Sequence, residues 1–191
     1  MTPLFTLVIC PGWHPPHLTE AFLAALRSLP GLPIRLWVVP PTCPPYSGWH
    51  MAQFLWEQRD CADSPDPSQS LAIVSFSAGV VGAIGAAHLW RLSGGHMAAF
   101  IACDGWGVPL VGDFPIYRVS HDRWTHWTTA GLESREGFYA DPPVAHLDLW
   151  QFPDQVTGWW LQRSQSPTRT TAIAVIHNWL ANAADFAKKY Q

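Results

Sequence analysis

Short apolar runs alternate with stretches of helical periodicity along this chain, and that alternation limits the possible folds more than any other feature. An apolar run of five or six residues has the length of a strand buried on both faces. Strands that alternate with helices form a parallel sheet with right-handed crossovers and helices on both faces. The apolar runs lie at 4–10, 34–39, 71–76, 99–103 and 116–119, and helical spacing lies at 17–29, 49–59, 78–92 and 168–190. We therefore expect residues 1–191 to form one α/β domain, a three-layer α/β/α sandwich with a mostly parallel sheet.

The composition excludes several classes of protein. Hydrophobic residues make up 48% of the chain and charged residues 13%, so apolar burial is ample and disorder is not expected. The net charge is −3 and the 11 Lys and Arg residues form no basic run, which argues against nucleic-acid binding. The sequence has no apolar stretch of the roughly 18 residues that a transmembrane helix needs, so no integral membrane segment is expected.

The beginning of the chain and its cysteines indicate a cytoplasmic protein. The first residues carry no positive charge and reach Pro11-Gly12 after a short apolar run, which is typical of a buried strand and not of a signal peptide. The four cysteines show no CxxC spacing. We expect neither a disulfide framework nor a zinc site, and no other metal or cofactor.

The strongest functional motif is Ser75-Phe76-Ser77-Ala78-Gly79, which stands between the third apolar run and the third helical segment. A serine in a sharp strand-to-helix turn projects its hydroxyl from the edge of the sheet, where it can act as a nucleophile. Ser77 is the candidate, and the N–H of Ala78 is a candidate donor to an oxyanion. The alternative interpretation is that Ser75 or Ser77 simply caps the following helix.

A second motif, Pro11-Gly12-Trp13-His14, follows the first strand. A glycine-containing loop at this place can supply the second oxyanion N–H, from Trp13 or His14. An ordinary turn is the alternative, because Pro-Gly alone would explain one.

A serine nucleophile needs a base and a carboxylate that orients the base. His146 is the candidate base, and Asp122, just past the fifth strand, is the expected carboxylate. Asp104, at the end of the fourth strand, is the competing carboxylate. His121 and His126 flank Asp122, and they either support the acid or lie on a solvated helix face.

The order of these motifs resembles the α/β-hydrolase superfamily, in particular the small, capless branch typified by the retinoblastoma-binding-protein-9-like serine hydrolases. The shared features are the Pro-Gly-Trp loop, the serine turn, an acid after the fifth strand, and a histidine followed by a Trp-Pro element, here Trp150-Gln151-Phe152-Pro153. The resemblance covers roughly residues 4–160. It implies a reduced hydrolase fold with no large cap, a Ser77–His146–Asp122 triad, esterase-type chemistry and no cofactor. Ser75 and Ala145 stand where that branch usually has glycine.

The chain is also rich in tryptophan, with 12 residues. Only about 12 residues separate the fourth and fifth strands, too few for a helical cap. We expect loop side chains to wall an apolar substrate pocket at the carboxyl edge of the sheet, namely His14, Trp106, Trp124 and Trp127. Alternatively, these tryptophans bind a partner protein or a membrane surface.

Three functional hypotheses follow. The first is a serine hydrolase that cleaves an ester or thioester of a small to medium apolar molecule. The second is a catalytically silent hydrolase fold that serves as a binding or assembly module through its Trp-rich loops. The third, a flavodoxin-like phosphate or nucleotide binder, is weak because no glycine-rich phosphate loop follows any strand.

Overall fold

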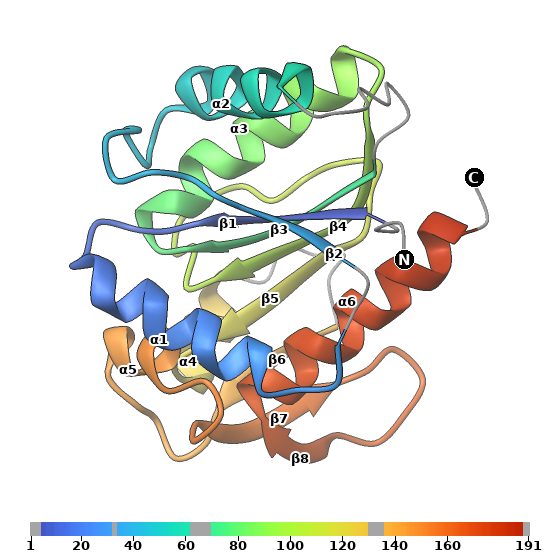
Figure 1. The fold of residues 1–191 in the computed structure, drawn as a ribbon. Helices are drawn as coiled ribbons and strands as arrows, with labels where there is room; N and C mark the ends of the chain where they lie inside the picture. Colours follow the sequence, from blue (N-terminus) through green and yellow to red (C-terminus); the bar gives the residue numbers. More distant parts are fainter. Residues whose placement is uncertain (1–4, 32–33, 62–69, 130–135, 189–191) are drawn as a thin grey trace.

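One sheet of eight strands forms the centre of the computed structural model, which describes residues 5–31, 34–61, 70–129 and 136–188 (Figure 1). The strands are β1 (Phe5–Cys10), β2 (Ile34–Val38), β3 (Ser70–Phe76), β4 (His96–Cys103), β5 (Ile116–Ser120), β6 (Gly137–Ala140), β7 (Thr157–Leu161) and β8 (Thr168–Thr171). Their order in the sheet is β2-β1-β3-β4-β5-β6-β7-β8. Neighbours from β2 to β6 pair in parallel, whereas β7 and β8 are added antiparallel. The predicted α/β sandwich with a mostly parallel sheet is confirmed.

Helices cover both faces of this sheet, as Figure 1 shows. They are α1 (Pro16–Arg27), α2 (Gly48–Asp60), α3 (Ala78–Leu92), α4 (Arg123–Thr129), α5 (His146–Gln151) and α6 (Ala172–Lys188). Side chains of α2 and α3 pack on one face, and those of α1, α5 and α6 pack on the other. All residues of β1 and β3 are buried, because these central strands are covered on both sides.

The last third of the chain differs from the expectation. Residues 168–171 form the edge strand β8, and the terminal helix begins only at Ala172. The strand's sequence, Thr-Arg-Thr-Thr, suits an edge strand with little burial and carries no apolar signal. The irregular segment expected at 123–143 contains α4 and β6. Parts of the expected elements, at residue 4, residues 62–69, 130–135 and 189–190, lie outside the described residues.

Two further features concern the surroundings of the sheet. Residues 104–115, which join β4 to β5, contain turns and no helix, so no cap is inserted there. No helix in the described ranges is both long enough and apolar enough to span a membrane.

Candidate active site

The candidate residues come together because several parallel strands end at the same edge of the sheet. Ser77 follows β3, Asp104 follows β4, His121 follows β5, and His146 begins α5 after β6. The carboxyl ends of parallel strands share one edge, which is the usual place for ligand sites in such sheets. Residues far apart in the sequence thereby lie within hydrogen-bonding distance.

Ser77 stands in a strained strand-to-helix turn. Its backbone has φ 53° and ψ −126°, a region that residues other than glycine rarely adopt, and α3 begins at the next residue. The turn is tight: a Cβ atom at Gly79 would lie 2.5 Å from the carbonyl oxygen of Cys10. The serine at the first motif position is accommodated, because the fully buried Ser75 hydroxyl donates to the Ile101 carbonyl at 3.2 Å. The alternative that Ser77 caps the helix is not supported, since its side chain makes no capping hydrogen bond.

Ser77, His146 and Asp104 form one chain of hydrogen bonds. The Oγ of Ser77 lies 3.0 Å from Nε2 of His146, and Nδ1 of His146 lies 2.8 Å from Oδ2 of Asp104. An ionised carboxylate can only accept, so Nδ1 carries the hydrogen and donates it to Asp104. Nε2 is left as an acceptor for the Ser77 hydroxyl.

The carboxylate of Asp104 is almost completely buried and has three hydrogen-bond donors. Its side chain is 1% exposed. Oδ2 also accepts from Nδ1 of His121 at 2.8 Å, and Oδ1 accepts from the backbone N–H of His121 at 2.9 Å. Burial alone would raise the pKa of Asp104, but the hydrogen bonds from His121 and His146 outweigh it and lower that pKa below its ordinary value.

The carboxylate that is hydrogen-bonded to His146 is Asp104, and not Asp122 as expected from its position after β5. Asp122 accepts the backbone N–H of Thr125 in the first turn of α4, and its Oδ2 lies 3.3 Å from Nε2 of His121. The backbone of Asp104 has φ 51°, a left-handed conformation that aspartate tolerates. His121 therefore bridges the two carboxylates, and its hydrogen bond to Asp104 raises its pKa above the ordinary value.

A stack of aromatic rings packs against one face of the His146 imidazole. Phe76 lies 4.7 Å from His146 at an interplanar angle of 22°, and Trp150 lies 5.0 Å from Phe76 at 15°. Phe22 of α1 continues the stack, 3.9 Å from Trp150 at 6°. The indole N–H of Trp150 donates to Thr19 at 3.3 Å. Phe22 lies in the segment 17–29, which was expected to be helical, but nothing in the sequence linked it to the histidine.

The two candidate oxyanion donors lie on either side of Ser77. Ala78 is the first residue of α3, and the first N–H groups of a helix have no partner within it. A Cβ atom at Gly12 would lie 2.9 Å from Cβ of Ser77, so this loop passes directly beside the serine. Trp13 comes next, with a side chain that is 81% exposed, and it would act through its backbone N–H.

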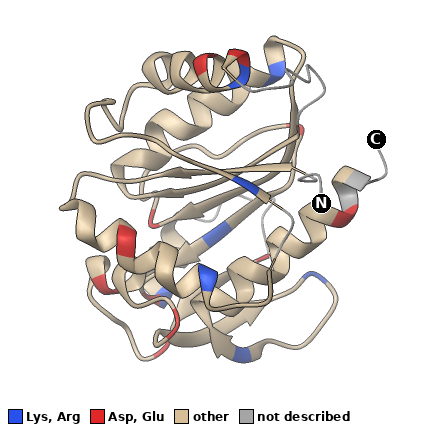
Figure 2. Cartoon of the chain, viewed as in Figure 1, with Lys and Arg blue, Asp and Glu red and all other residues tan. Residues whose placement is uncertain are grey.

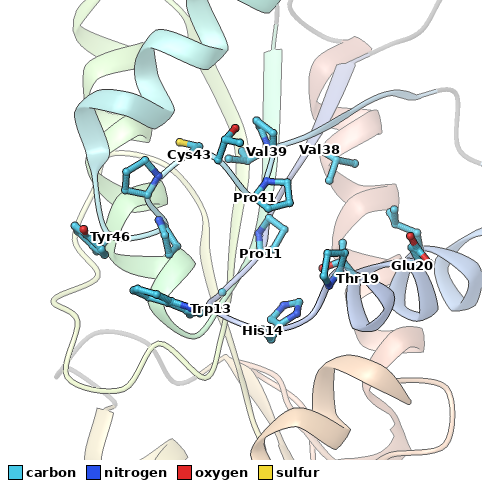
Figure 3. A pocket seen from close by; sticks show the side chains of 17 residues that line it. Pro11, Trp13, His14, Thr19, Glu20, Val38, Val39, Pro41, Cys43 and Tyr46 are labelled. Carbon is cyan, nitrogen blue, oxygen red and sulfur yellow. The ribbon is translucent and has the colours of Figure 1, made fainter.

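A cavity of about 490 Å³ opens beside this loop (Figure 3). His14 lines it, as expected for a pocket residue, and Trp13 lines it as well. The other tryptophans expected in the pocket are not among its lining residues: Trp106, Trp124 and Trp127 are 73%, 76% and 59% exposed. The opposite wall was not predicted from the sequence. It is built from residues 38–46, which form the end of β2 and the Pro-rich loop before α2. Its prolines indicated only a loop.

The same cluster contains the described side chains that lie close enough to share a metal ion, namely Asp104, His121 and His146. Both imidazoles already donate to one oxygen of Asp104 at 2.8 Å. These hydrogen bonds account for the arrangement without an ion.

Comparison with known proteins adds no relative: no family model matches the chain, and no curated protein matches it. The chemistry of the site must therefore be inferred from its geometry. That geometry combines a serine hydroxyl, a histidine able to accept its proton, and a buried carboxylate that orients the histidine.

Proposed function

We propose that this protein is a serine hydrolase that cleaves an ester or thioester of a small to medium apolar molecule. The observation that carries the proposal is the hydrogen-bonded chain from Ser77 through His146 to Asp104, at 3.0 and 2.8 Å. This arrangement of nucleophile, base and orienting carboxylate is recognised by geometry and not by sequence position. The mostly parallel sheet is compatible with an α/β-hydrolase fold. In this protein the acid, Asp104, follows β4.

In this mechanism, Oγ of Ser77 attacks the substrate carbonyl carbon while Nε2 of His146 takes the hydroxyl proton. The negative oxygen that develops accepts hydrogen bonds from the N–H groups of Ala78 and Trp13. The bond to the leaving oxygen or sulfur then breaks, and His146 returns the proton to the departing alcohol or thiol. In the second half, a water molecule gives a proton to His146 and attacks the acyl-enzyme. The acid product leaves and the Ser77 hydroxyl is restored.

A fluorophosphonate probe tests the proposal, because it reacts covalently with an activated serine. The wild type should be labelled and Ser77→Ala should not. Ser75→Ala is the matched control, since Ser75 belongs to the same motif but is buried and bonded to Ile101. This variant should still be labelled, with circular dichroism showing that all three proteins are folded. Absence of labelling in the wild type, or equal labelling of Ser77→Ala, would refute the proposal.

A second candidate function, binding without catalysis, is favoured by one observation. Trp13, Trp106 and Trp124 are each more than 70% exposed, at 81%, 73% and 76%. Trp13 and Trp106 stand on loops and Trp124 stands on α4, and exposed indole rings are a common means of contacting a partner protein or a membrane surface. A folded wild type that resists the probe at every pH would favour this candidate over the hydrolase.

A further inference from the structure

The cavity beside the β1–α1 loop is lined mainly by prolines and other apolar side chains. Six prolines line it, together with Trp13, Tyr46, Leu23, Val38 and Val39: Pro11, Pro16, Pro40, Pro41, Pro44 and Pro45. Proline rings have few conformations to lose, so such a wall is already shaped before a ligand arrives. The volume of about 490 Å³ falls within the range of small-molecule sites. An apolar group of moderate size therefore fits here.

Ser77 and His146 are not among the residues that line the cavity, but the β1–α1 loop that lines it passes beside Ser77. Gly12 both lines the cavity and approaches Ser77, where an added Cβ would lie 2.9 Å from the serine Cβ. His14, the next-but-one residue, lines the cavity and packs edge-on against Phe76 at 5.6 Å. A group attached to Ser77 would have to pass Gly12 to enter this space. The cavity is thus placed to hold one side of the substrate.

One side chain gives the cavity a charge. Glu20 is the sole Asp, Glu, Lys or Arg among the described residues that line it. Glu20 stands on α1, across the cavity from Trp13 and Tyr46 in Figure 3, and it is the acidic residue coloured on that helix in Figure 2. None of the ion pairs formed between described residues involves Glu20. Its carboxylate is left to interact with whatever occupies the cavity.

We propose that the cavity selects an apolar group that ends in a cation, held by the proline-rich wall along its length and by Glu20 at its tip. The substrate class of the proposed hydrolase is then an ester or thioester with an apolar, positively charged group, and groups ending in a carboxylate are disfavoured. The statement about cleavage rests on the proposed function, but the binding selectivity does not. A carboxylate attracts a cation and repels an anion. Glu20 is exposed to solvent, so water screens both effects and the expected selectivity is modest.

The binding arm of the test uses Ser77→Ala, which removes the nucleophile but leaves the cavity. Its probes are 4-phenylbutylamine, 4-phenylbutanol and 4-phenylbutyrate, which share their apolar part and differ in charge. Titration calorimetry or NMR at low salt should show the amine binding about fivefold tighter than the alcohol, and the acid more weakly, as expected for one partly exposed charge pair. Glu20→Gln should abolish the difference. Glu57→Gln, at an exposed site on α2 outside the cavity, should preserve it.

The catalytic arm uses 4-nitrophenyl esters of 6-(trimethylammonio)hexanoate, hexanoate and the monoester of adipate. The wild type should prefer them in that order by kcat/KM, and Glu20→Lys should reverse the order. Equal affinity of amine and acid, or a preference unchanged by Glu20→Gln, would overturn the inference. Selective binding without hydrolysis of any ester would refute the proposed function and leave the binding inference standing. Hydrolysis without charge preference would do the reverse.

Discussion

Replacing either of two carboxylates distinguishes the residue that orients His146. In Asp104→Asn, the new amide presents an NH₂ group in place of one carboxylate oxygen. If its oxygen keeps the hydrogen bond from the backbone N–H of His121, its NH₂ faces the Nδ1 atoms of His121 and His146, which lay 2.8 Å from Oδ2. The amide NH₂ group and the Nδ1–H group of His146 are both donors, so no hydrogen bond can form between them. His146 relieves the conflict by moving its hydrogen to Nε2, and it can no longer accept the proton of Ser77.

The expected loss in kcat is up to about 10⁴-fold, the size seen when a histidine base is held in the wrong tautomer. This corresponds to roughly 5 kcal/mol of activation free energy. Asp122→Asn should behave differently, because the contacts of Asp122 are with His121 and the first turn of α4. We expect its kcat to stay within about threefold of the wild type and its stability to change little, because asparagine caps a helix about as well as aspartate.

The measurement is steady-state hydrolysis of a chromogenic apolar ester by the two variants and the wild type, with urea denaturation as the control for folding. Fluorophosphonate labelling rates should follow the same order, because labelling also needs an activated Ser77. If Asp122→Asn loses as much activity as Asp104→Asn while both remain folded, the assignment of Asp104 is wrong. If neither loses activity, the hydrogen-bonded chain plays no part in the reaction.

Three further perturbations test the surroundings of the site. Gly79→Ala should lower the free energy of unfolding by a few kcal/mol in a urea titration, because the added Cβ meets the backbone carbonyl of Cys10 at 2.5 Å. Burial, with Arg118 nearby, lowers the pKa of His126 to about 4. As the pH falls, His126 therefore binds a proton in the unfolded protein at a higher pH than in the folded protein. Up to about 3 kcal/mol of stability should be lost from pH 6.5 to 4, and His126→Gln should flatten that dependence of the urea midpoint on pH. The ring of His121 lies 5.9 Å from that of His146, and its hydrogen bond to Asp104 raises its pKa. His121→Asn removes a group whose positive charge opposes a second positive charge nearby, so the acid limb of the kcat/KM profile should move to higher pH.

The sequence was most informative where side chains are buried on both faces of the sheet. The runs that become β1 and β3 contain almost only apolar residues, and short runs of this kind are shielded from water on both faces when they form central strands. The strand β8 carries no such signal, because an edge position demands little burial of its Thr and Arg side chains. The same reasoning explains why the parallel core was predicted and the antiparallel edge was missed.

Within the candidate site, chain order indicated which residues would lie close together, but it did not indicate which carboxylate would contact the histidine. Ser77 and His146 follow parallel strands, and the structure brings them within hydrogen-bonding distance. Asp104 and Asp122 both follow strands at the same edge, so strand order could not separate them. The structure separates them, because Asp104 is the one that accepts a hydrogen bond from His146. The cavity depends on two loops that meet in space, which periodicity does not reveal.

The stacked aromatic rings connect His146 with residues that are remote from it in the sequence. Phe22 belongs to a helix that contributes neither the nucleophile nor the acid, yet its ring supports Trp150, which supports Phe76 and, through it, the imidazole. A smaller side chain at Phe22 or Trp150 would leave space beneath Phe76, on which the imidazole rests. Under the proposed mechanism, substitutions inside the core should therefore change catalysis as well as stability.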